Sequence, residues 1–198
     1  MARGVTDRLL FLRAFLAHPR RVGAVLPTSR RAVRDMLDMA DVGSARLVVE
    51  LGAGTGVYTR EILERLRPDG ELVAFERDPN LARLLTEQYR DPRLRVVCDS
   101  AENARTHLDG ATADLVVSGL PFTSLGSPLR QRIFEEIAHI LAPDGAVLVL
   151  QYSPAVQGQL RRVFPHVRRR ISPLNVPPAF LYACSMQGKR DNSSSGVT

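Results

Sequence analysis

Short apolar runs alternate with helix-like segments along most of this chain, and this alternation limits the possible folds more than any other feature. Five runs are rich in Val, Leu and Ala and mostly apolar, as strands are when helices cover both faces of a parallel sheet. These runs occupy residues 46–51, 71–76, 94–98, 113–118 and 146–151. The segments between them have helical length and end at Gly, Pro or Asp, so the sequence predicts an α/β fold with a doubly wound parallel sheet.

The residues after 151 predict a different ending to the sheet. A helix at 154–164 precedes two strand-like runs, 166–171 and 179–185, whose proline-rich connection suits an antiparallel hairpin. The expected sheet therefore has seven strands and is mostly parallel. A chain of 198 residues with 44% hydrophobic side chains is large enough for one such core. We divide it into an N-terminal amphipathic helix and cap (1–40), one α/β domain (41–186) and a polar tail expected to be disordered (187–198).

The charge of the chain favours an anionic partner. The formal net charge is +6, and every Lys or Arg except Lys189 is an arginine. This composition suits either nucleic acid or a lipid surface. No apolar run approaches the roughly 18 residues that a membrane-spanning helix needs, so any membrane contact is expected to be peripheral. Cys98 and Cys184 lie in apolar runs and are expected to be core thiols of a cytoplasmic protein, with no metal site.

A glycine-rich turn follows the first expected strand. Gly52, Gly54 and Gly56 lie where the strand becomes a helix, which allows a ligand to approach the backbone closely. Dinucleotide sites more often space their glycines G-x-G-x-x-G, whereas this turn reads G-x-G-x-G behind the acidic Glu50. A carboxylate at that position repels phosphate and attracts the cationic end of a ligand.

Two further acids follow the next two strands. Glu76 ends the second strand, where a carboxylate can accept hydrogen bonds from both hydroxyls of a ribose. Asp99 follows the third strand and is placed to receive the exocyclic amine of adenine. A ribose, an adenine and a cationic end without phosphate describe S-adenosylmethionine (SAM). An ordinary nucleotide-binding Rossmann domain is the alternative.

This ordered set resembles the class I SAM-dependent methyltransferases over about residues 48–151. The resemblance implies a Rossmann-like class I methyltransferase fold for residues 41–186 and SAM as the cofactor. It also implies a role for Glu50 in organising the loop and the methionine ammonium end, for Glu76 at the ribose, and for Asp99 with Ser100 or Ala101 at the adenine. The full expected cofactor-binding set is Glu50, Gly52, Gly54, Gly56, Tyr58, Thr59, Glu76, Arg77, Asp99, Ser100, Ala101 and Ser118.

The fourth strand runs into Ser-Gly-Leu-Pro-Phe, residues 118–122, which resembles the bacterial phospholipid N-methyltransferases. Residues 11–31 and Asn-Val-Pro-Pro-Ala-Phe-Leu-Tyr at 175–182 also resemble that family, which often has Leu in place of Val176. The family methylates phosphatidylethanolamine stepwise to phosphatidylcholine, so the resemblance implies a phospholipid substrate. Adenine-modifying relatives carry Asn or Asp where this chain has Ser118, and acceptors of that side chain and of the backbone hold a planar amino group. Serine is shorter and offers only a hydroxyl, so this set of acceptors is incomplete here.

The N-terminal segment supports a membrane partner independently. Val5, Leu9, Leu12 and Leu16 fall on one helical stripe, and arginines surround it. Such a helix suits the surface of an anionic membrane, which predicts a peripheral location on its inner, cytoplasmic face. The alternative is a helix that packs on the sheet edge and covers the cofactor.

Three aromatic residues are expected on the acceptor side. Phe122 follows the fourth strand, Tyr152 the fifth, and Tyr182 lies on the final hairpin. Aromatic faces hold methylated ammonium groups, so all three are candidate substrate-binding residues, and Ser118, Tyr152 and Phe122 are candidate catalytic residues. The alternative is that these aromatics only pack against helices.

Three other functions stay open at this point. A soluble small-molecule N-methyltransferase would have the same cofactor site and no membrane affinity. An RNA adenine dimethyltransferase is less favoured, because Ser118 replaces the Asn of those enzymes and no RNA-binding domain follows the catalytic fold; no nucleic-acid partner is therefore expected. A non-enzymatic SAM-binding or lipid-surface protein is the third.

Overall fold

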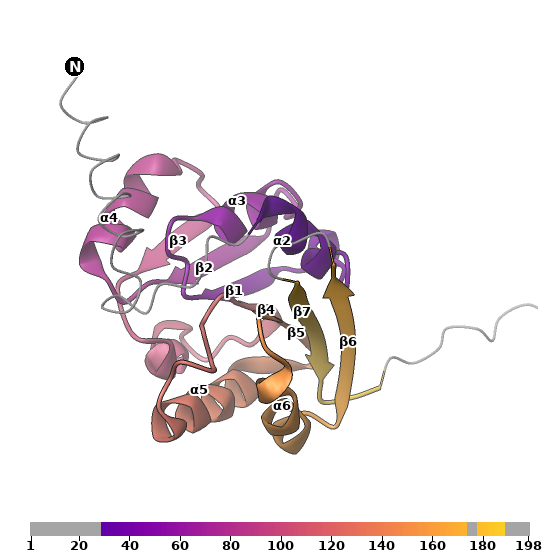
Figure 1. Cartoon of the computed structure of the whole chain (residues 1–198). Coiled ribbons are helices and arrows are strands. Elements are labelled where there is room, and N and C mark those ends of the chain that lie inside the picture. The colour runs from indigo at the N-terminus through magenta and orange to yellow at the C-terminus, as the bar shows by residue number, and fades with distance from the viewer. Residues whose placement is uncertain (1–28, 174–177, 189–198) are drawn as a thin grey trace, which may run out of the picture.

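The computed structural model describes residues 29–173 and 178–188. The expected helix at 5–16, the motif start at 175–177 and the tail from 189 onward lie outside the described residues. The described part forms one seven-stranded sheet between two layers of helices (Figure 1).

The sheet has the strand order β3-β2-β1-β4-β5-β7-β6. The first five strands pair in parallel, and β7 is antiparallel to both β5 and β6, which confirms the expected closing hairpin. The strands are β1 (Leu47–Leu51), β2 (Glu71–Phe75), β3 (Leu94–Val97), β4 (Ala113–Ser118), β5 (Leu141–Gln151), β6 (His166–Ser172) and β7 (Ala179–Ser185).

Helices cover both faces of the sheet. The helices α2 (Arg30–Leu37), α3 (Val57–Leu63) and α4 (Pro79–Gln88) pack on one face. The 3-10 helix η2 (Ala101–His107), α5 (Ser127–Ile140) and α6 (Gln157–Val163) pack on the other. Short 3-10 turns η1 (Val42–Ser44) and η3 (Pro154–Val156) complete the described elements. Helix α4 begins at a polar cap: the Asp78 side chain accepts from the backbone N–H of Asn80 and Leu81.

The structure corrects several sequence-based boundaries. The helical segment expected between the third and fourth strands, at about 102–108, is a 3-10 helix at 101–107. Strand β5 begins at Leu141 rather than at Ala146, because Leu141 pairs with Ala113 before an irregularity shifts the register to Leu115 and Ala146. The buried Leu141 side chain anchors this early start in the core.

The position of each strand in the sheet decides its burial. Central strands β1 and β4 are almost wholly buried, as expected. Strand β3 lies at one edge of the sheet and is only half-buried, so helices cover it less completely than the apolar sequence predicts. For the same reason Cys98, just after β3, is exposed, and only Cys184 is a core thiol. Its burial raises the pKa of the Cys184 thiol to about 12.

Candidate functional site

The glycine turn lies at the carboxyl ends of the parallel strands. Gly52, Gly54 and Gly56 have φ values of 80°, 56° and 81°, a backbone region that residues with side chains rarely adopt. A Cβ at Gly52 would lie 2.7 Å from the Leu120 side chain, and one at Gly56 would lie 2.7 Å from Leu85. A Cβ at Gly54 would meet no atom within 4 Å, so this residue leaves open space beside the backbone. The turn therefore packs tightly at both ends and is open at its centre.

Glu50 lies fully buried in β1 beneath this turn. Its Oε2 atom accepts a hydrogen bond of 2.7 Å from the Thr59 hydroxyl in α3. Its Oε1 atom is buried and has no hydrogen-bond partner among residues 29–173 and 178–188. Burial raises the pKa of Glu50 to about 7, against the opposing effect of the Thr59 hydrogen bonds. A buried carboxylate with one unpaired oxygen is suited to a cationic ligand group, which would supply the missing partner and favour the charged form.

Glu76 is held against the glycine turn. Its Oε2 atom accepts from the Gly54 N–H at 2.8 Å, and its Oε1 atom accepts from the Asp78 N–H at 2.9 Å. Each carboxylate oxygen retains a further lone pair. The side chain is thus fixed in direction by two backbone groups, while Arg77 beside it is exposed.

Asp99 is held by three donors after β3. Its Oδ1 atom accepts from the Ser100 N–H at 2.6 Å and from the Asn103 side chain at 3.0 Å, and its Oδ2 atom lies 2.8 Å from His107 Nε2. The hydrogen bond to His107 is the main cause that lowers the pKa of Asp99 to about 2, followed by the bond to Asn103. Ala101 beside them is buried.

Sequence reasoning assigned no functional role to His107. Its ring makes an edge-on contact with Phe75 at the end of β2, with 5.7 Å between ring centroids. The eight-residue separation from Asp99 matches no α-helical spacing, so only the fold of η2 brings the two side chains together.

The end of β4 is packed directly against the glycine turn. Gly119 N–H donates to the Leu51 carbonyl at 3.0 Å, and a Cβ on Gly119 would lie 3.0 Å from the Gly52 carbonyl and 3.2 Å from the Tyr58 ring. Ser118 is fully buried, and its Oγ atom accepts a long hydrogen bond of 3.4 Å from Leu120 N–H. The missing side chain of Gly119 therefore allows the two loops to approach closely.

A second residue that sequence reasoning missed ties β5 to this loop. The buried Gln151 side chain donates from Nε2 to the Leu120 carbonyl at 2.8 Å and to the Leu150 carbonyl at 2.7 Å. The sequence did contain an indication of this role, because Gln151 is a polar residue at the end of an otherwise apolar strand.

The three expected acceptor-side aromatics lie in different environments. Phe122 is fully buried and packs on Phe134 of α5 with 4.5 Å between ring centroids, because its N–H donates to the Leu120 carbonyl and turns the chain inward. Tyr182 is fully buried in the same core cluster, and burial raises its pKa. Tyr152 is half-buried and packs with the α2 and α3 side. The structure therefore does not bring the three rings together at one exposed face.

The Tyr152 and Tyr182 hydroxyls share one property. Both oxygen atoms are buried and have no hydrogen-bond partner within the part of the chain that the structure describes. Buried hydroxyls normally have a partner, so each marks a polar atom that another group could satisfy. Of the two, only Tyr152 follows directly after the carboxyl end of a strand beside β4.

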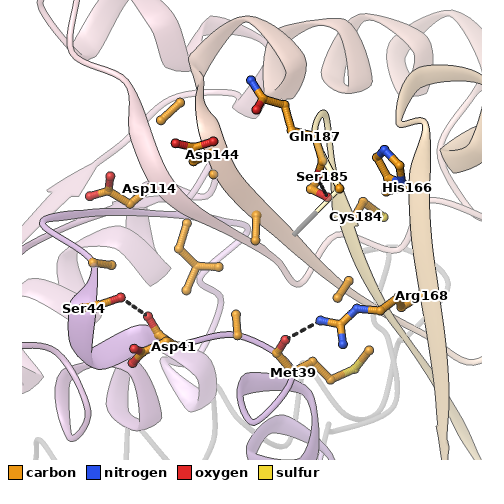
Figure 2. Close-up of a pocket in the computed structure, with 18 residues that line it drawn as sticks. Met39, Asp41, Ser44, Asp114, Asp144, His166, Arg168, Cys184, Ser185 and Gln187 are labelled. Carbon is orange, nitrogen blue, oxygen red and sulfur yellow. Dashed lines mark hydrogen bonds between the residues drawn. The ribbon is translucent and has the colours of Figure 1, made fainter. Parts of the chain in front are cut away.

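A pocket of about 750 Å³ lies at the opposite edge of the sheet (Figure 2). Asp114, Asp144, His166 and Arg168, which surround it, come from the beginnings of β4 and β6 and from within β5. Two of these side chains form hydrogen bonds with the backbone. Asp114 accepts from the Arg46 and Leu47 N–H groups at 2.7 and 3.0 Å, and Arg168 donates to the Met39 carbonyl at 3.0 Å. Within residues 29–173 and 178–188 no cluster of His, Cys, Asp or Glu has the makings of a metal site.

Comparisons with known proteins show the family to which the chain belongs. The family described as "Methyltransferase domain" matches residues 48–145, which include the glycine turn and all three acids. The chain is 36% identical over 183 residues to the ornithine lipid N-methyltransferase of Singulisphaera acidiphila, a match that covers 90% of this chain and 95% of that protein. The ribosomal RNA small subunit methyltransferase A of Prosthecochloris aestuarii is 28% identical over 72% of this chain, which spans only 51% of that enzyme.

Solved structures share the fold. The 1,6-didemethyltoxoflavin-N1-methyltransferase of Burkholderia thailandensis, solved with its substrate and S-adenosylhomocysteine, superimposes with a TM-score of 0.65 at 18% identity and covers 92% of this chain and 90% of that one. An O-methyltransferase family protein from the same organism has a TM-score of 0.65 at 17% identity and covers 84% of this chain and 59% of that one. The chain therefore belongs to the class I SAM-dependent methyltransferases, uses SAM as its cofactor, and has a lipid N-methyltransferase among its relatives.

Proposed function

We propose that this enzyme transfers methyl groups from SAM to the primary amine of a membrane lipid headgroup, with phosphatidylethanolamine as the acceptor. The observation that carries the proposal is the 36% identity to an ornithine lipid N-methyltransferase over nearly the full length of both chains. Ornithine lipid is the second candidate acceptor for the same reason, since it also offers a primary amine. The Ser-Gly-Leu-Pro-Phe sequence after β4 supports phosphatidylethanolamine through its resemblance to phospholipid N-methyltransferases.

The proposed cofactor roles begin at the glycine turn. The unpaired Oε1 atom of Glu50 would accept from the ammonium group of the methionine end, which gives this buried atom its missing partner. Gly54 would face the cofactor, because no atom lies within 4 Å of the place a Cβ would occupy. Tyr58 and Thr59 would act from the first turn of α3, with Thr59 holding the other oxygen of Glu50. The buried carboxylate, the open backbone and the absence of a dinucleotide glycine spacing all fit SAM.

The residues proposed to bind the ribose and the adenine of SAM follow β2 and β3. Glu76 would accept from the ribose hydroxyls with the lone pairs that its backbone contacts leave free. Asp99 would accept from the adenine amine, with the backbone of Ser100 and Ala101 beside it. Arg77 is exposed next to Glu76 and would cover the adenine side.

The proposed acceptor site lies between the ends of β4 and β5. Ser118 and Tyr152 would border it, and the free lone pairs of the Tyr152 hydroxyl would be available to an amine N–H. Phe122 and Tyr182 would contribute indirectly, by packing in the core behind the residues that border the acceptor site, since both rings are fully buried.

Bound SAM supplies a methyl group on an electrophilic sulfonium. The protein must hold the acceptor nitrogen in line and exclude water, which are positioning effects. A primary ammonium has a reference pKa of about 10.4, with lysine as the guide, and loses a proton before its nitrogen can act as a nucleophile. Burial against apolar side chains favours the neutral amine, so the proposal requires no strong dedicated base.

We further propose that the enzyme acts at the membrane surface. None of the helices that the structure describes is long and apolar enough to cross a bilayer. The arginine-bordered apolar stripe at 5–16, outside the described residues, would lie in the headgroup region.

A direct assay tests the proposal. The full chain is incubated with SAM labelled in its methyl group and with phosphatidylethanolamine or ornithine lipid in neutral detergent micelles, and mono-, di- and trimethylated lipids are separated. We expect label in at least one lipid, with a preference for phosphatidylethanolamine. Glu76→Ala, assayed at a SAM concentration near the wild-type dissociation constant, should give less label. Label in an adenine-containing RNA or in soluble amines only, with none in either lipid, would contradict the proposal.

A further inference from the structure

The C-terminal part of the chain carries an unusual distribution of charge. No Asp or Glu occurs between Asp144 and Asp191. The described residues of this stretch include five arginines, two on α6 and three on β6, and all five are exposed. We call them the α6–β6 basic surface: Arg161, Arg162, Arg168, Arg169 and Arg170.

These arginines differ from those in the rest of the fold. Elsewhere seven arginines form ion pairs with carboxylates: Arg34, Arg60, Arg65, Arg67, Arg93, Arg95 and Arg132. Among residues 29–173 and 178–188, none of the α6–β6 arginines is within ion-pair distance of a carboxylate. Arg168 donates to the Met39 carbonyl and Arg169 to the Gln157 side chain, both neutral acceptors. The positive charge of this surface is therefore not neutralised within the described fold.

The surface lies on the outermost strand of the sheet. Strand β6 pairs only with β7, and Figure 1 shows it at one side of the molecule with α6 beside it. Side chains alternate along a strand, so Arg169 lies on the α6 face and Arg168 and Arg170 on the α2 face. The basic side chains thus surround the free edge of the sheet. A carboxylate, Asp35 of α2, approaches the end of the strand, where it accepts from the Ser172 hydroxyl at 2.6 Å.

An exposed apolar residue adjoins these charges. Ile171 is 51% exposed, the largest exposed fraction among the large hydrophobic residues that the structure describes. Ile171 and Gln151 both pair with Phe180 of β7, one from each side. Ile171 is therefore level with the end of β5, two strand spacings, or about 10 Å, across the sheet. The exposed isoleucine lies at the same edge of the sheet as the proposed acceptor site.

A simpler explanation is that arginines prevent edge-to-edge pairing of β6. Charged side chains commonly protect edge strands in this way. That explanation accounts for charges on the strand itself. It does not account for Arg161 and Arg162 on the neighbouring helix, for the absence of acids over the whole stretch, or for an exposed isoleucine at the free edge.

We propose that the α6–β6 basic surface, with Ile171, docks on an anionic lipid bilayer and brings the carboxyl edge of the sheet to the headgroups. The inference rests on the proposed lipid-methylating function and specifies which face of the fold meets the membrane. Arginine guanidinium groups bind lipid phosphates, and the apolar Ile171 side chain enters the headgroup boundary. Nucleic acid fits less well, since single-stranded RNA is held by stacking on exposed aromatic rings, and Phe164, Phe180 and Tyr182 of this unit are buried or half-buried.

Charge reversal on the strand tests the proposal in the full chain. Arg169→Glu/Arg170→Glu should weaken binding to phosphatidylglycerol-containing vesicles at least about tenfold, since each basic contact is worth about 1 kcal/mol and 1.4 kcal/mol is tenfold. Arg169→Lys/Arg170→Lys keeps the charge and should bind within about twofold of wild type. The matched control is Arg83→Glu/Arg90→Glu, which makes the same charge change on exposed residues in and just after α4, near the opposite edge of the sheet.

Two further measurements separate the possible failures. Thermal unfolding should give similar midpoints for all variants. The strand variants should methylate lipid in neutral micelles as fast as wild type, because the enzyme does not have to dock on an anionic surface in that assay. If the control variant loses as much vesicle binding as the strand variant, net charge alone explains the effect and the proposal is overturned. Loss of binding to single-stranded RNA, with vesicle binding intact, overturns it in favour of nucleic acid. Absence of lipid methylation by wild type in micelles contradicts the proposed function instead.

Discussion

Among single residues, Glu50 is the one that we expect to couple proton binding to cofactor binding. Its pKa is raised to about 7, so the side chain is largely protonated below that pH and charged above it. A cationic cofactor end pairs only with the charged form. We therefore expect SAM affinity to rise as the pH increases from about 5.5 to 7.5, a range in which an α-ammonium group stays mostly charged.

The variant Glu50→Gln provides the control for this prediction. Glutamine has a similar shape and no titration, so SAM binding measured by calorimetry should be weaker and nearly independent of pH. The ligand-free protein should show the opposite trend in stability. Because the folded state retains the Glu50 proton between pH 4.5 and about 7 while the unfolded chain loses it, the free energy of unfolding should fall over that range relative to Glu50→Gln. A wild-type SAM affinity that does not change with pH would refute this role of Glu50.

Glu76 gives a second prediction at the same scale. Glu76→Ala should lower SAM affinity at least about tenfold, because charge-assisted hydrogen bonds are worth about 1.5–3 kcal/mol each and the Gly54 N–H also loses its acceptor. The matched control is Glu71→Ala at the other end of β2, where the side chain makes only an exposed ion pair with Arg95. Equal SAM dissociation constants for wild type and Glu76→Ala would exclude a ribose contact.

Asp99 and His107 should act as one unit. His107 holds the Asp99 carboxylate at 2.8 Å, so His107→Ala should weaken SAM binding by misdirecting Asp99. In a double-mutant cycle, Asp99→Ala/His107→Ala should lose less affinity than the sum of the single variants, with a coupling of at least about 0.5 kcal/mol. Strictly additive losses would mean that His107 contributes only to packing against Phe75.

At the element scale, the segment after β4 joins the site to the core through Phe122. Its ring is fully buried against Phe134, so Phe122→Ala should lower the free energy of unfolding by about 3–5 kcal/mol. The SAM affinity of the folded fraction should stay within about twofold of wild type. The exposed Ile171→Ala should change stability by less than about 0.5 kcal/mol in the same urea titration. A Phe122→Ala protein of normal stability with altered product methylation would instead place this ring at the acceptor.

At the scale of the whole molecule, the net charge of +6 predicts salt-sensitive attachment to membranes. Raising ionic strength from 0.1 to 1 M shortens the Debye length from about 10 to about 3 Å. Co-sedimentation with phosphatidylglycerol vesicles should decrease strongly over this range. Lipid methylation in neutral micelles should change little, because that assay does not depend on long-range attraction. Vesicle binding that does not respond to salt would exclude an electrostatic surface of any location.

The alternation of strands and helices, the hairpin at the end and the ligand type expected at the first turn could be predicted from the amino-acid sequence. Each of these depends on residues close together in the chain. Alternation of apolar runs with helical segments predicts a parallel sheet with helices on both faces. The left-handed backbone at Gly52, Gly54 and Gly56 requires glycine, and acids after successive parallel strands meet at one edge.

The partners and the exposure of those residues follow from the three-dimensional fold and could not be predicted from the sequence. His107 meets Asp99 through the fold of η2, and Phe122 turns into the core because α5 places Phe134 there. Cys98 is exposed, and the β6 arginines lie on a free edge, because β3 and β6 are the outermost strands. Local pattern does not specify strand order, since the neighbours of a strand come from distant parts of the chain. Burial, pairing and pKa follow from those neighbours.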